Sequence, residues 1–335
     1  QKTKNMTDTN LLLAITMIVF FAMYIGAMIF EGKGFLKAQT FLNMLNANAA
    51  LIIASCGMSI VMITGSIDIS VGGVAALVSM CCAVYLDYHG GNVVTAIFIS
   101  LGIGLLFGLV QGYLVAYLDI QPFIVSLAGM FFARGMTTIV NTEPFNVQNE
   151  AFVKLKETRV IVPGLGSVNK LGKYVNAYVE IGVVVALILV IVLFCMLRWS
   201  KSGRNFYAVG GNQQSALMLG INVKKTKFMA HLLCSLLAGI GGFVYFMHVG
   251  SGSASHATGM EMNAIASSII GGTMLTGGVG NIIGTLFGVL SLSTIQNIVS
   301  SAGLDQAWWT GITIAAMLCL FLVIQSVVMS RKKKA

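Results

Sequence analysis

The sequence predicts an all-α, polytopic membrane protein with about ten transmembrane helices, an internal repeat, and broken, Gly-rich helices near a solute path. Of its 335 residues, 57% are apolar and only 9% are charged, whereas soluble domains carry about 25% charged residues. Apolar runs of roughly 20 residues, enough to cross a hydrocarbon core about 30 Å thick, recur along the chain. Lipid is therefore expected to be its main solvent.

Ten candidate spans follow one another in a single transmembrane domain that covers residues 1–335. The first span is long and has no small-residue cleavage pattern, so we expect it to remain as an anchor. Gly271 and Gly272 interrupt the eighth span, which is short. In chain order the spans are 11–30, 44–64, 69–87, 93–118, 122–141, 178–197, 228–250, 262–276, 280–302 and 308–328.

Basic residues are confined to particular loops, and this sets the expected orientation. The segment 198–227 holds several Lys and Arg and no acid, and both chain ends are basic. Because cytoplasmic loops accumulate Lys and Arg, this segment and both termini are expected in the cytoplasm. The loop 142–177, with mixed charge, is then expected outside. The basic residues of these loops explain the net charge of +9, so nucleic acid is not expected as a partner.

An internal repeat is visible at an offset of 212 residues, from Met62 to Met274. The run Met62 to Ile67 matches Met274 to Val279, and the two halves cover roughly 11–118 and 223–330. Ten spans would make the copies parallel, and one miscounted helix would make them inverted. Transporters often place the solute path where such repeats meet and where paired helices are broken.

Glycines in the spans fall into two groups. Six of them follow the small-xxx-small spacing that lets helices pack closely. The glycines between Gly65 and Gly73 surround polar residues instead, and we interpret them as a break beside the solute path. The six packing glycines are Gly104, Gly108, Gly112, Gly280, Gly284 and Gly288.

Two ionisable residues at membrane depth are candidates for function. An ionisable group there costs about 2.5–3.5 kcal/mol on insertion scales, so it usually faces a cavity or a partner. Asp68 is expected to cap the third helix together with Ser70, to lie beside the path, or both. Arg134 is expected either to extend to an interface or to pair with Glu261 or Asp68.

Other polar side chains in the spans suit a neutral, hydroxylated solute better than an ion. Each desolvated hydroxyl must regain a hydrogen-bond partner, which amides and carboxylates supply. Interhelical hydrogen bonding is the alternative for each residue taken singly. The predicted substrate-path residues are Asn46, Asn48, Ser66, Asp68, Ser70, Gln111, Arg134, Glu261, Asn263, Gln296 and Asn297.

Motifs of enzymes and metal sites are absent from the sequence. There is no G-x-x-x-x-G-K-[ST], H-E-x-x-H or G-x-S-x-G pattern. The six cysteines lie in apolar spans and the four histidines are scattered, so no metal site is expected. Any ATP must be handled by another subunit. A stand-alone carrier that couples transport to an ion through Asp68 or Glu261 is the alternative, and a membrane enzyme is a weaker one.

Four ordered blocks of the chain resemble permeases of bacterial ABC importers for ribose, galactose and related simple sugars. The first, Gly65-Ser66-Ile67-Asp68-Ile69-Ser70-Val71-Gly72, resembles the family motif G-G-I-D-L-S-V-G. Asn263 departs from the Asp that is common in the family. Within the family, Ala128 to Phe132 and Trp308-Trp309-Thr310 are similar to the galactofuranose-type permease. The other three blocks are Pro122 to Gly135, Tyr207 to Val223 and Ala264 to Gly288.

The resemblance implies a non-catalytic transport subunit of the bacterial inner membrane, with no cofactor of its own. A cytoplasmic ABC ATPase would use ATP and Mg²⁺, and a periplasmic or lipid-anchored binding protein would deliver the sugar. A second permease subunit, the same or a related chain, and membrane lipid complete the expected partners. The segment 198–227 would couple to the ATPase, with a short helix from Asn212 to Leu219 between glycine breaks. Its expected coupling residues are Gly210, Gly211, Asn212, Ser215, Ala216, Gly220 and Ile221.

Overall fold

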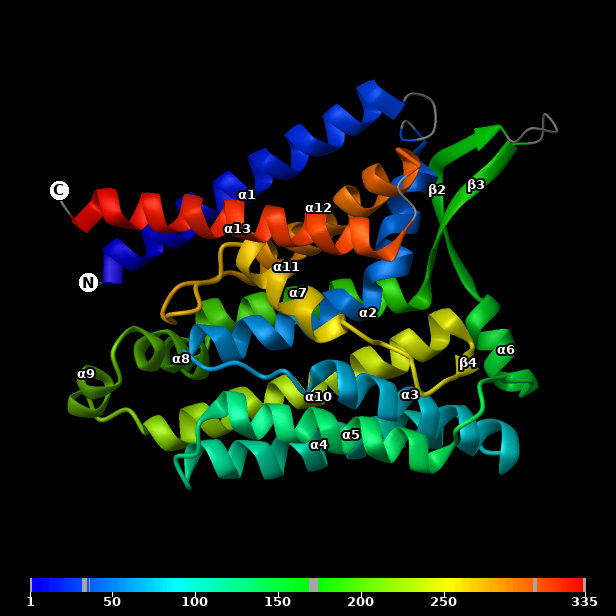
Figure 1. The fold of residues 1–335 in the computed structure, drawn as a ribbon, viewed down its shortest axis with the longest axis horizontal. Coiled ribbons are helices and arrows are strands. Elements are labelled where there is room, and N and C mark those ends of the chain that lie inside the picture. The colour runs from blue at the N-terminus through cyan, green and yellow to red at the C-terminus, as the bar shows by residue number, and fades with distance from the viewer. Residues whose placement is uncertain (1, 32–34, 36, 169–173, 304–305, 334–335) are drawn as a thin grey trace.

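A computed structural model describes residues 2–31, 35, 37–168, 174–303 and 306–333. In these ranges the chain is mostly helical (Figure 1), which confirms the all-α prediction. Lys334, part of the predicted basic C-terminus, lies outside the described residues. The helices are α1 (Lys2–Glu31), α2 (Ala38–Ile63), α3 (Val71–Tyr88), α4 (Val93–Ala116), α5 (Pro122–Val140), α6 (Glu150–Glu157), α7 (Ile181–Trp199), α8 (Lys201–Gly211), α9 (Gln213–Met218), α10 (Val223–Val249), α11 (Met260–Ile270), α12 (Ile282–Ser301) and α13 (Ala307–Lys333).

Among the described residues, eight helices are long and apolar enough to cross a membrane, which makes this a multi-pass membrane protein. They are α1, α2, α3, α4, α5, α7, α10 and α12, and α13 contributes a shorter apolar run, Trp308–Val323. The predicted span 262–276 is wrong as a full crossing. Its helix, α11, has 11 residues, about 16 Å at 1.5 Å per residue. It ends because Gly272 takes a left-handed φ of 86°.

The end of α11 is buried, and its free carbonyl groups find partners on other helices. Thr16 of α1 donates a hydrogen bond to the carbonyl of Ile270 at 2.9 Å. Gln325 of α13 donates another to the carbonyl of Ile269 at 2.7 Å. Irregular backbone is tolerated at membrane depth only where its polar groups are satisfied inside the protein. These two side chains therefore allow a half-length helix within the bundle.

The helices run between two distinct ends of the molecule. Figure 1 shows both termini together with α8 and α9 at one end, which we call the basic end. At the other, the hairpin end, lie α6 and the antiparallel hairpin of β2 (Arg159–Val168) and β3 (Tyr174–Glu180). The pairing of β1 (Phe145–Asn146) with β4 (Ser251–Gly252) joins the loop after α5 to the segment after α10. The described parts of the predicted loop 142–177 thus carry ordered structure.

Close helix packing relies on the glycines that the sequence assigned to it. Along α4, Gly104, Gly108 and Gly112 face Ser235, Leu232 and Phe228 of α10. On α12, Gly284 and Gly288 face backbone atoms of Gly271 and Ser267. The predicted role in helix packing is therefore confirmed for these five glycines and wrong for Gly280, which lies in the loop before α12.

Two glycines on α4 provide a matched test of this packing. A Cβ at Gly104 would lie 2.7 Å from the carbonyl oxygen of Ser235, whereas a Cβ at Gly102 would meet nothing within 4 Å. We expect Gly104→Ala to destabilise the protein by about 1–3 kcal/mol, as overpacking does, and Gly102→Ala to be neutral or slightly stabilising. Thermal unfolding of both variants in detergent measures the difference. Equal losses of melting temperature would contradict the packing assignment.

The two copies of the repeated motif meet near the basic end. The backbone N–H of Gly278 donates to the carbonyl of Ile63 at 2.8 Å. Gly65 and Gly277, which occupy matched positions, both take left-handed φ values of 80° and 83°. Helices α2 and α11 thus both end close to this junction. Whether the two copies are parallel or inverted stays a prediction.

Candidate functional site

Asp68 organises a buried polar cluster between three helices. It lies in the irregular segment between α2 and α3 and is fully buried. Its Oδ1 accepts hydrogen bonds from the backbone N–H and the hydroxyl of Ser70, at 3.0 and 2.6 Å. Ser235 of α10 donates to its Oδ2 at 3.4 Å, and Gln111 of α4 donates to the Ser70 hydroxyl at 2.9 Å. The predicted path residues Asp68, Ser70 and Gln111 thus share one network.

The predicted capping of α3 is wrong for Ser70, whereas the Asp68 carboxylate does accept the backbone N–H of the N-cap residue, Ser70. Ser70 occupies the N-cap position, but its side chain makes no cap hydrogen bond because the hydroxyl donates to Asp68. Unsatisfied groups remain beside this cluster: Gln111 Oε1 and both ring nitrogens of His231 are buried without a hydrogen-bond partner among the described residues. His231 lies one helical turn from Ser235 on α10. The sequence analysis missed His231 and Ser235.

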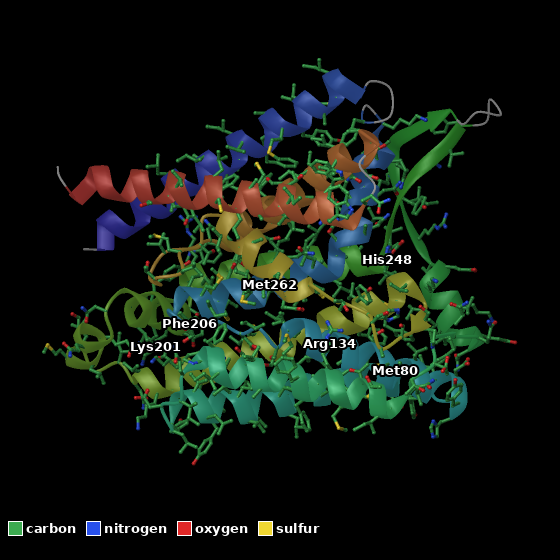
Figure 2. All side chains as sticks on the ribbon, in the orientation of Figure 1. Met80, Arg134, Lys201, Phe206, His248 and Met262 are labelled. Carbon is green, nitrogen blue, oxygen red and sulfur yellow. The ribbon has the colours of Figure 1, made fainter. Side chains whose placement is uncertain are left out.

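Arg134 and Glu261 form a second polar centre, and Figure 2 shows Arg134 within the bundle. Arg134 Nη2 lies 3.9 Å from Glu261 Oε2 and donates to the carbonyl of Ala257 at 2.8 Å. Its Nη1 donates to the carbonyl of His256. The side chains of Arg134 and Glu261 are 22% and 12% exposed. Of the alternatives left open for Arg134, the structure selects pairing with Glu261.

Local backbone geometry brings this pair together. The segment between α10 and α11 turns through Ala257 and Gly259, which have positive φ values of 51° and 80°. Gly72 of α3 faces Glu261, and a Cβ at Gly72 would collide with the carboxylate. The glycine of the motif in α3 is therefore needed for close approach to the charged pair.

The other predicted path residues, all of them described, form no hydrogen bond or ion pair with these two centres. Ser66 is buried, and its N–H donates to the carbonyl of Val61. Asn263 is half-buried on α11 beside Met262, which is 58% exposed. Gln296 and Asn297 are half-exposed near the end of α12.

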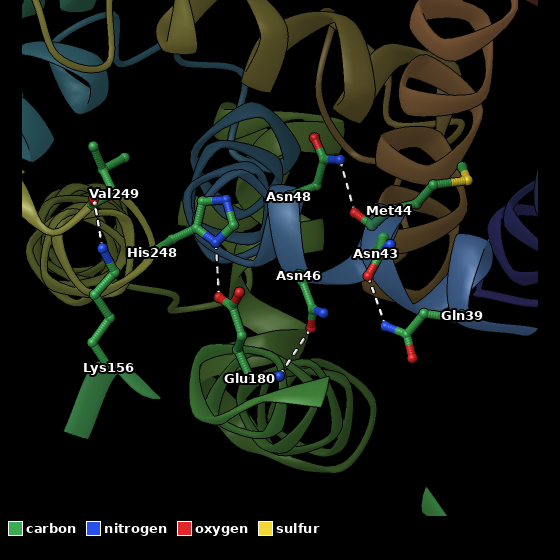
Figure 3. Close-up of polar contacts among 9 residues, drawn as sticks. All are labelled: Gln39, Asn43, Met44, Asn46, Asn48, Lys156, Glu180, His248 and Val249. Atoms are coloured by element: carbon green, nitrogen blue, oxygen red, sulfur yellow. Dashed lines mark hydrogen bonds and ion pairs between the residues drawn. The ribbon is translucent and has the colours of Figure 1, made fainter. Parts of the chain in front are cut away.

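Asn46 and Asn48 belong to a polar group near the hairpin end (Figure 3). Asn46 accepts a hydrogen bond from the backbone N–H of Glu180 at 2.9 Å, and the carboxylate of Glu180 lies 2.7 Å from Nδ1 of His248. Asn48 donates to Ser293 of α12 at 2.9 Å. These contacts tie the base of the hairpin and α12 to α2, which is the interhelical bonding that the sequence left as an alternative.

The predicted short helix in the segment 198–227 is confirmed as α9. Asn212 caps its start by accepting the N–H of Ser215 at 2.8 Å, and Gly220 follows its end with a φ of 74°. The predicted break at Gly210 and Gly211 is wrong, because both belong to the end of α8. A Cβ at Gly210 would collide with the carbonyl of Ile63, so this glycine serves close packing.

The surface of α9 is more apolar than the sequence analysis recognised. Ala216 is buried with Val209 and Val223 in a small cluster that also contacts Ile221. On the exposed side, Leu217, Met218 and Leu219 are 59%, 88% and 77% exposed. We call these three residues the α9 apolar tip. Three apolar residues in a row between Asn212 and Gly220, in a basic segment, were the sequence signal for it.

Comparison with known proteins identifies the family. Residues 40–322 match the family described as branched-chain amino acid transport system / permease component. The chain belongs to this permease family. The permease is similar to the inner membrane ABC transporter permease protein YjfF of Escherichia coli K12, with 35% identity over 96% of this chain and 93% of that protein. No solved structure matches it.

Two further relatives are named for import of particular sugars. The fructose import permease protein FruG of Bifidobacterium longum is 34% identical over 84% of the permease and 81% of that protein. The ribose import permease protein RbsC of Escherichia coli K12 is 32% identical over 81% of each chain. The resemblance to permeases of sugar importers is thus confirmed, as is the prediction of a transport subunit.

Proposed function

We propose that the permease is the membrane subunit of an ATP-binding cassette importer and carries a monosaccharide across the inner membrane. The observation that carries this proposal is the similarity along most of the chain to permeases named for fructose and ribose import. The galactofuranose-type likeness stays a prediction. The two repeat halves, 11–118 and 223–330, also stay a prediction.

We propose that the basic end faces the cytoplasm and that the α9 apolar tip contacts the ATPase. The tip is exposed, and it is surrounded by basic residues and no acids between 198 and 227. A short amphipathic helix of this kind suits a groove on a partner. The binding protein would deliver the sugar at the hairpin end, and a second permease subunit and lipid would cover the remaining apolar faces.

Within the bundle, we propose that the Arg134–Glu261 centre lies on the sugar path. Both side chains retain some exposure, and their spare donors and acceptors suit the hydroxyls of a neutral sugar. Asn263 and the other predicted path residues are proposed to line the path at other depths. ATP and Mg²⁺ would be used by the ATPase alone, so the permease would perform no covalent chemistry.

Removing the α9 apolar tip should separate the permease from its ATPase. We expect the triple change Leu217→Ser, Met218→Ser and Leu219→Ser to lower co-purification of the ATPase at least tenfold, since about 1.4 kcal/mol of lost contact is enough for that factor. The control changes Ile161→Ser and Leu165→Ser, which are also exposed apolar residues but at the hairpin end. An equal loss of ATPase co-purification in the control, or no loss of it in the triple variant, would contradict the proposed contact.

Cysteine labelling tests the proposed orientation. In a variant whose native cysteines are replaced by alanine, cysteines introduced at Lys225 and Lys156 should react with an impermeant maleimide from opposite sides of the membrane. Lys225 lies at the start of α10, and Lys156 lies on α6 at the hairpin end. We expect Lys156→Cys to react in intact cells and Lys225→Cys only after permeabilisation. Labelling of both from one side would refute the topology.

A further inference from the structure

The last turns of α8 rest on a junction where both copies of the repeated motif meet. The phenol of Tyr207 donates a hydrogen bond to the carbonyl of Gly280 at 2.8 Å. Next to it, the N–H of Gly278 donates to the carbonyl of Ile63 at 2.8 Å. One helix of the segment 198–227 therefore contacts the loop after α2 and the loop after α11 together.

Gly210 closes this junction without any side chain in between. A Cβ at Gly210 would collide with the carbonyl of Ile63 and lie 2.6 Å from the nitrogen of Gly278. A Cβ at Gly277 would in turn lie 2.8 Å from the carbonyl oxygen of Gly210 and 2.9 Å from the nitrogen of Gly65. Three backbone segments are thus in direct contact. Such close-packed interiors are nearly incompressible and transmit displacement.

The junction is also connected to the α9 apolar tip. Asn212 is both the residue that ends α8 and the N-cap of α9, so no flexible linker separates the two helices. From the junction, the chain leads through the loop after Ile63 to Asp68 and α3, and through Gly280 to the start of α12. A displacement of α9 would therefore be passed through this junction both to the segment between α2 and α3 and to the segment between α11 and α12.

We infer that Tyr207 and Gly210 are positioning residues that transmit movement of α9 to both repeat loops at once. This inference rests on the proposed contact between α9 and an ATPase. The inference gives α8 a role beyond docking, because a movement of α8 would displace the loops of both repeat copies together. The Tyr207 bond is available at any pH near neutrality, since burial raises the pKa of Tyr207 to about 12 and keeps the phenol protonated.

The test measures sugar transported per ATP hydrolysed by the permease reconstituted with its ATPase and binding protein. Tyr207→Phe keeps the ring and removes only the hydrogen bond to Gly280, and Gly210→Ala inserts a methyl group into the junction. Gly102→Ala on α4 is the matched control, because a Cβ there meets nothing within 4 Å and Gly102 lies outside the junction. Binding of the ATPase is measured for each variant by co-purification.

We expect normal ATPase binding and sustained hydrolysis in Tyr207→Phe, with at least a threefold fall in sugar transported per ATP. In Gly210→Ala the sugar transported per ATP should fall at least tenfold, and Gly102→Ala should match the unmodified permease. An unchanged ratio in Tyr207→Phe, or an equal fall in the ratio from Gly102→Ala and Gly210→Ala, overturns the inference. Failure of the proposed function is distinct: the unmodified permease would then show no ATP-dependent uptake at all.

Discussion

Replacing Glu261 with leucine should abolish transport and sharply reduce the amount of folded permease. The change leaves the guanidinium of Arg134 at membrane depth without the carboxylate that lies 3.9 Å away. An unpaired charge there costs about 2.5–3.5 kcal/mol, a large share of the roughly 5–15 kcal/mol that stabilises a typical protein. The yield of monodisperse protein in detergent and sugar uptake in vesicles measure the two effects.

A second variant separates charge pairing from simple loss of packing. Arg134→Met combined with Glu261→Leu removes both charges, and we expect it to recover folded protein while transport stays low. Glu143→Leu, on the exposed loop after α5, serves as the control and should have little effect. If the double variant folds no better than Glu261→Leu alone, the ion pair is not what holds α5 to α11.

Asp68→Leu should be the other most damaging single change. It removes the acceptor for the Ser70 N–H, the Ser70 hydroxyl and the Ser235 hydroxyl. Each buried donor left without a partner costs about 1–3 kcal/mol. Because this network fixes the segment between α2 and α3 against α10, we expect loss of both stability and transport. Thermal unfolding in detergent and ATP-driven uptake report the result.

Asp68→Asn tests the same site without removing its oxygen acceptor. We expect it to fold, to lose less stability than Asp68→Leu, and still to require ATP. Asp87→Asn, near the end of α3, is the control; Asp87 accepts the N–H of Gln148. An ion-coupled carrier would instead lose its dependence on the ion gradient in Asp68→Asn, and that outcome would support the rival function.

The sequence predicted those features that depend on short-range patterns. The spacing of Gly104, Gly108 and Gly112 is a local signal for close packing, and their contacts with α10 confirm it. Asn212 and Gly220 mark the ends of α9 because capping needs only nearby residues. The length of α11 was misjudged because apolar composition continues past Ile270, whereas the left-handed glycine after it ends the helix.

Contacts between distant segments could not be read from the sequence. Both Glu261 and Asp68 were possible partners for Arg134, and only the fold places Glu261 beside it. The role of Gly210 also depends on a partner 147 residues earlier in the chain, Ile63, whose carbonyl fills the space a side chain would need. The α9 apolar tip was missed because neighbouring residues in the chain do not reveal which side of a short helix is buried.

The measurement that tests the central claim most directly is uptake of radiolabelled monosaccharides into vesicles that contain the purified permease together with the subunits that co-purify with it. The account predicts that uptake requires hydrolysable ATP on the side of the basic end and persists when ionophores remove all ion gradients. Uptake that proceeds without ATP and disappears with the ionophores would contradict it.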